Sequence, residues 1–150
     1  FTELLKQHRI SKRLVRDLRY VPEEVTQLEA RDFLAVRTKA GSEGVLLYNA
    51  YVVPFALERR RPNAAGRTEA IICDICASWR RGTESTSIIF RKSATRSVSY
   101  LVCADLDCSL HVRDLTDAAK LSRTQLREHI STQERISRLH ARLEDMLAQQ

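Results

Sequence analysis

Four cysteines in two close pairs constrain this chain more than any other feature of its sequence. Cys73 and Cys76 form a C-x-x-C pair, and after 26 intervening residues Cys103 and Cys108 form a second pair with four residues between them. The sequence has no other cysteine. A C-x-x-C turn directs two thiolates toward one centre, and zinc takes four such ligands tetrahedrally with Zn–S distances of about 2.3 Å. The spacing therefore predicts one structural Zn²⁺ bound by all four cysteines.

Other uses of paired cysteines are weaker alternatives. Disulfides belong to oxidising compartments, and the first residues lack the layout of a signal peptide. They also lack an initiating Met, so we expect a truncated form of a cytoplasmic protein. A hydrolytic metal would need an open coordination position, which four cysteines fill. His111 could replace a cysteine, but we expect it to pack beside the site.

The interval between the pairs has the composition of a β-hairpin. Residues 87–90 and 98–102 are rich in β-branched and aromatic side chains, and the basic polar residues 91–97 join them. The order is then cysteine knuckle, hairpin, second pair and helix. This order predicts a treble-clef zinc finger, a binding module whose fold depends on the metal.

The remaining segments predict an α+β fold. Apolar residues in 1–19 are spaced for one or two short helices, and 23–36 also has helical spacing. Strands are expected at 45–48, 51–55 and 70–72, and the chain turns helical from 116. We therefore predict an N-terminal helical segment over 1–37, a β-rich treble-clef zinc-finger domain over 45–115 and a long C-terminal helix over 116–150.

The charge balance favours an anionic partner. Lys and Arg number 25 against 19 Asp and Glu, a formal net charge of +6. Such a surface suits RNA or an acidic protein, and net charge alone does not separate them. The N-terminal helices and the loop 58–67 are candidates for phosphate contact, with plain solvation as the alternative. No apolar run approaches the ~20 residues that cross a bilayer, so no membrane partner is expected.

The sequence contains no recognisable catalytic motif. Its four glycines are dispersed and form no phosphate-binding loop. Asp105 and Asp107, between two cysteines, are better explained as loop-shaping groups than as an acid–base pair. We therefore expect no enzymatic activity and no small-molecule substrate.

Residues 100–113, YLVCADLDCSLHVR, together with the C-x-x-C pair, resemble a known family. They are similar to the C-terminal treble-clef zinc finger of the FusB-type elongation factor G-binding proteins. Residues 31–37, RDFLAVR, look like the helical lead-in of its short actinobacterial members, the "FBP domain" proteins. The resemblance implies binding to elongation factor G on the ribosome, promotion of its release, and a role like that of fusidic acid resistance proteins. The best-studied members carry a separate N-terminal helical bundle, for which this chain is too short.

The hairpin and its tip are the candidate contact surface, because aromatic and arginine residues commonly anchor interfaces. The candidate residues are Phe90, Arg91, Lys92, Arg96 and Tyr100. Packing of both aromatic side chains under the hairpin is the alternative. For the whole protein, the second hypothesis is an RNA-binding zinc-finger protein associated with the ribosome, and the third is a metal-dependent or thiol-redox enzyme.

Overall fold

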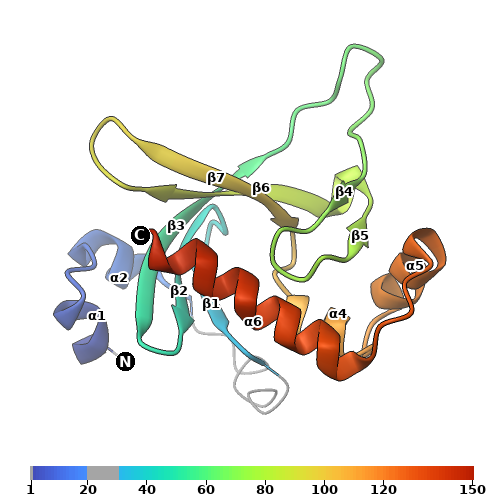
Figure 1. Cartoon of the computed structure of the whole chain (residues 1–150). Coiled ribbons are helices and arrows are strands. Elements are labelled where there is room, and N and C mark those ends of the chain that lie inside the picture. Colours follow the sequence, from blue (N-terminus) through green and yellow to red (C-terminus); the bar gives the residue numbers. More distant parts are fainter. Residues whose placement is uncertain (1, 20–30) are drawn as a thin grey trace.

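A computed structural model describes residues 2–19 and 31–150 of the chain. Its centre is a five-stranded antiparallel sheet in the order β1-β2-β3-β6-β7, beside a two-stranded sheet of β4 and β5 (Figure 1). The strands are β1 (Leu34–Arg37), β2 (Glu43–Tyr48), β3 (Tyr51–Arg59), β4 (Ile71–Ile72), β5 (Trp79–Arg80), β6 (Ser85–Arg91) and β7 (Ser97–Cys103). The predicted α+β class and the hairpin are confirmed.

Helices flank this sheet. In the described residues they are α1 (Thr2–Gln7), α2 (Lys12–Asp17), α4 (Cys108–Val112), α5 (Asp117–Leu126) and α6 (Thr132–Ala148). The two short N-terminal helices match the prediction for residues 1–19. None of the described helices is long and apolar enough to cross a membrane.

Strand β2, the second strand of the sheet, is buried on both faces. Successive side chains of a strand point to opposite faces, and Leu46 packs with Leu139 and Leu143 of α6. The neighbouring Val45 packs instead with Leu5 and Leu14 of the N-terminal helices. Figure 1 shows α6 running along the sheet and α1 and α2 lying beside β2 and β3. The two helical ends of the chain therefore cover opposite faces of one sheet.

The helix predicted over 23–36 is wrong at its C-terminal end. Residues 34–36 belong to β1, which pairs with β2 from Leu34 opposite Leu47 to Arg37 opposite Gly44. The apolar spacing there suits either structure, and pairing with the edge of β2 decides in favour of a strand. Residues 23–30 lie outside the described part of the chain. The division into three segments stays a prediction.

The helical stretch expected from residue 116 is present but divided in two. Arg127 adopts a left-handed conformation, with φ 50°, and ends α5. Ser131 begins α6 with a capping box, in which its side chain accepts from the Glu134 N–H and the Glu134 side chain accepts from the Ser131 N–H. Only α6 packs along the sheet as the long C-terminal helix.

The buried carboxylate of Asp32 connects the segment before β1 to the rest of the fold. Arg113 donates two hydrogen bonds to Asp32, at 2.7 and 2.9 Å, and His140 Nε2 lies 2.8 Å from the same carboxylate. On its other side, His140 Nδ1 lies 2.8 Å from the hydroxyl of Tyr48. Burial alone would raise the pKa of Asp32, but the hydrogen bonds from Arg113 and His140 outweigh it and hold that pKa below its usual value. The carboxylate is therefore ionised at neutral pH.

Candidate metal centre

The first cysteine pair lies on a tight turn between β4 and β5. The backbone N–H groups of Ile75 and Cys76 point at the Cys73 sulfur, at 3.4 and 3.5 Å. Ala77, with φ 58°, takes a left-handed conformation and its N–H donates to the Cys73 carbonyl at 2.8 Å. This turn brings two sulfurs together and surrounds one of them with N–H groups, an arrangement that stabilises a thiolate.

The second pair spans the exit from β7. Cys103 is the last residue of that strand and Cys108 is the first residue of α4. Between them, Leu106 adopts φ 55° and its N–H donates to the Cys103 carbonyl at 3.1 Å. The carboxylate of Asp105 accepts a hydrogen bond from the Asp107 N–H at 2.9 Å. Asp105 therefore shapes this loop, as the sequence predicts.

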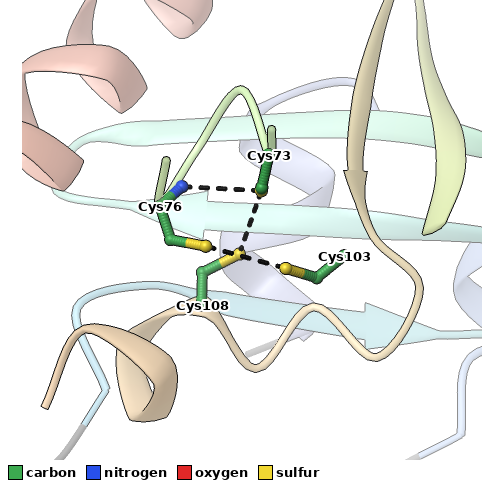
Figure 2. Close-up of side chains that lie close together, drawn as sticks. All are labelled: Cys73, Cys76, Cys103 and Cys108. Carbon is green, nitrogen blue, oxygen red and sulfur yellow. Dashed lines mark hydrogen bonds between the residues drawn. The ribbon is translucent and has the colours of Figure 1, made fainter. Parts of the chain in front are cut away.

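All four sulfurs converge in one buried cluster (Figure 2). The Cys73 and Cys108 sulfurs are 3.8 Å apart, the Cys76 and Cys103 sulfurs are 3.6 Å apart, and all four lie within 4.8 Å of one another. A tetrahedron with Zn–S bonds of about 2.3 Å has sulfur–sulfur edges of about 3.8 Å, whereas a disulfide bond is about 2.05 Å long. The donor set and its spacing fit one structural zinc ion, and none of the four cysteines forms a disulfide.

The electrostatics of the cluster explain why it needs a cation. Hydrogen bonding with Cys103 and the other sulfurs, together with burial, raises the pKa of Cys108 well above its ordinary value. The same kind of contact, led by the Cys103 thiol, lowers the pKa of Cys76 well below its ordinary value. The neighbouring sulfurs and burial therefore oppose the ionisation of Cys108. A bound Zn²⁺ would supply the positive charge that stabilises its thiolate.

His111 packs beside the cluster, as predicted. Its Nδ1 lies 2.7 Å from the Thr116 hydroxyl and its Nε2 lies 3.2 Å from the Asp105 carboxylate. Both ring nitrogens are thus engaged outside the cluster. Cys103, Asp105 and His111 also approach one another closely enough to hold an ion, but Cys103 already belongs to the four-cysteine cluster. His111 therefore supports the loop around Asp105.

A second set of contacts fastens the first cysteine turn to the sheet and to α6. The Asp74 N–H donates to the Leu101 carbonyl at 2.8 Å, and the Leu101 N–H donates to the Asp74 carboxylate at 2.8 Å. Arg142 of α6 donates to the Asp74 carbonyl at 3.3 Å. This role of Asp74 was not predicted from the sequence, although a carboxylate inside a C-x-x-C turn could have indicated it. The metal centre thereby joins the hairpin to the helix that covers it.

The structure divides the predicted contact residues into two groups. Phe90 is 0% exposed and meets Tyr100 edge-on, with ring centroids 6.1 Å apart, and Tyr100 is partly buried. Phe90 therefore packs under the hairpin, and its prediction as a contact residue is corrected because no atom of it reaches the surface. Arg91, Lys92 and Arg96 are exposed at the tip.

Comparison with known proteins gives one match. A family model described as the FBP C-terminal treble-clef zinc-finger matches residues 10–149, nearly the whole chain. No curated protein matches, and no solved structure matches. The family match and the geometry of the cysteine cluster together support one structural zinc site in a treble-clef module.

Proposed function

This chain belongs to the FBP C-terminal treble-clef zinc-finger family, the FusB-type family, and from that premise we propose that it binds elongation factor G. In this proposal Cys73, Cys76, Cys103 and Cys108 ligate the zinc ion, and the metal has a structural role only. The protein acts in the cytoplasm, at the ribosome, without catalysing a reaction. Protection against fusidic acid is the extension of this role that the resemblance suggests.

The exposed basic tip of the hairpin is the observation that supports this contact surface best. Figure 1 shows β6 and β7 extending together away from α5 and the β4–β5 turn. Arg91, Lys92 and Arg96 have no carboxylate partner among the described residues. The Lys92 N–H donates to the Arg96 carbonyl at 2.9 Å and closes the tip. Three cations on a closed turn suit an acidic protein surface.

The proposed mechanism is a shift between conformations of the partner. A ligand changes such an equilibrium only by its difference in affinity for the two states. A sheet braced by zinc at one end and by α6 along its length presents the tip in a fixed position. Tighter binding to the conformation of elongation factor G that leaves the ribosome would promote its release.

Binding to purified elongation factor G tests the proposal. We expect wild-type protein to bind elongation factor G that has been purified free of RNA, as measured by calorimetry. Because the proposed contact is made by three exposed cations, the affinity should fall as the salt concentration rises. Replacing Arg91, Lys92 and Arg96 together with Ala should weaken binding at least about tenfold, because the three cations lie in the interface.

The matched control removes three other exposed cations. Arg9, Lys12 and Arg127 are exposed and have no carboxylate partner in the described parts of the chain. Their joint replacement with Ala should leave the affinity nearly unchanged. Absence of wild-type binding would refute the function, and equal effects of the two triple variants would refute the hairpin as the contact surface.

A further inference from the structure

A basic groove lies away from the hairpin tip. It has a volume of about 810 Å³ and runs between the end of β3, the turn that precedes β2 and the short 3-10 helix Gly82–Glu84. Arg37, Arg59 and Arg60 line it together with five serine or threonine residues, and its lining contains no aspartate or glutamate. Every charged side chain in this hollow is therefore positive.

Two of these guanidinium groups are held in place by neutral acceptors. Arg37 donates to the Ala104 carbonyl at 2.8 Å. Arg60 donates to the Glu69 carbonyl at 2.6 Å and to the Ser85 hydroxyl at 3.0 Å. A guanidinium carries five N–H donors, so most of them stay available on each arginine. Within residues 2–19 and 31–150, neither arginine pairs with a carboxylate, so no acidic side chain there offsets their positive charge.

The wall of the groove is preformed by a close backbone contact. A Cβ atom on Gly82 would lie 2.0 Å from the carbonyl oxygen of Thr68. Only glycine allows this approach between the 3-10 helix and the long loop that follows β3. Together with the bonds of Arg60 to Glu69 and Ser85, this contact fixes the loop beside the sheet. The cations of the groove are thus positioned before any ligand binds, which lowers the entropic cost of binding.

The groove continues into two further hollows around the turn of residues 38–42. They measure about 340 and 420 Å³, share lining residues with the groove, and Lys39 lines both. Acidic residues in them are already paired, as Glu43 is with Arg13 at 3.1 Å and Asp107 is with Arg31 at 3.0 Å. The positive charge therefore extends along a track, which suits a chain of anions better than one small anion.

We propose that this track binds the phosphate backbone of a nucleic acid. Arginine, serine and threonine side chains are the usual donors to phosphate oxygens, and such contacts carry no sequence information. The groove lining includes no aromatic side chain on which a base could stack. Binding should therefore be independent of sequence. This inference does not rest on the elongation factor proposal and assigns a different surface, because the hairpin tip contributes no residue to the lining.

Fluorescence anisotropy with a short labelled RNA duplex, and with a DNA duplex of the same sequence, tests the inference. Wild-type protein should bind both, with an affinity that falls linearly on a log–log plot against salt concentration. Replacing Arg37, Arg59 and Arg60 together with Gln should weaken binding at least about tenfold and reduce the salt slope by roughly 2–3. Zinc content and the unfolding midpoint of each variant report whether the fold is intact.

The matched control replaces Arg91, Lys92 and Arg96 with Gln and removes the same number of charges. It should keep its affinity for the duplex within about twofold.

The single substitution Arg59→Gln separates charge from structure. Arg37 and Arg60 also donate to backbone carbonyls, whereas Arg59→Gln disturbs no hydrogen bond of the described structure. This variant should weaken binding several-fold. Equal losses in the two triple variants, an unchanged Arg59→Gln, or no wild-type binding would each overturn the proposal. Binding of elongation factor G should persist in the groove variants, so the two proposals fail separately.

Discussion

Replacing Cys103 with Ser is expected to abolish stoichiometric zinc binding and to unfold the hairpin module. Structural zinc sites contribute on the order of 10 kcal/mol to folding, which is comparable to the whole stability of a domain. Cys103 ends β7, and its sulfur lies 3.6 Å from that of Cys76, so its loss opens the cluster between the hairpin and the first cysteine turn. Zinc content per chain and the fluorescence of Trp79, the single tryptophan, measure both effects.

The control for this substitution is Val102→Ala in the same strand. Val102 is fully buried beside Cys103 but supplies no ligand atom. Its truncation should lower the free energy of unfolding through lost packing and leave one zinc ion per chain. A Cys103→Ser protein that unfolds at the same temperature as wild type would show that the metal does not hold the fold together.

Replacing Asp32 with Asn should lower the free energy of unfolding by about 2–3 kcal/mol at pH 7. The side chain of Asp32 is 6% exposed and pairs with Arg113, and removing one charge of a buried pair leaves the other uncompensated. This loss is smaller than the roughly 3–5 kcal/mol of breaking a fully buried pair, because Arg113 keeps some contact with solvent. Denaturant unfolding of the zinc-bound proteins measures the difference, with the exposed Asp145→Asn as a control expected to change stability by less than about 0.5 kcal/mol.

The pH dependence of this difference has a definite sign. The pKa of Asp32 in the folded protein lies below its ordinary value, so its contribution is fully present above the unfolded value of about 3.9 and is lost as the pH falls through the folded value. The difference between wild type and Asp32→Asn should therefore persist at pH 5. If it disappeared between pH 7 and pH 5, the carboxylate would be protonated in that range, against this account.

The metal cluster was predictable because its signal is local and chemical. Four cysteines in two short-range pairs leave few arrangements, and β-branched residues mark the hairpin between them. The strands β2, β3, β6 and β7 were predictable because short runs of β-branched and aromatic residues are typical of strands. The continuous apolar run in β2 suits a strand that is covered on both faces. The sequence could not show that α6 and the N-terminal helices cover opposite faces, because that depends on contacts between distant segments.

Other features depended on tertiary contacts that no local pattern encodes. Residues 34–36 form a strand because the edge of β2 is available to pair with them, which overrides their helix-compatible spacing. Phe90 has the residue type of an interface anchor, yet alternation along β6 directs it into the core. The start of a new helix at α6 could have been predicted, because Ser131 and Glu134 have the spacing of a capping box. Of the groove arginines, only Arg59 and Arg60 could be singled out from the sequence, because they belong to the basic segment 58–67.

X-ray absorption at the zinc edge on the purified protein tests the central claim most directly. One zinc ion per chain with four sulfur neighbours at about 2.3 Å is the expected result. A coordination shell containing nitrogen or oxygen, or protein that folds without zinc, would contradict the four-cysteine centre on which the binding surfaces depend.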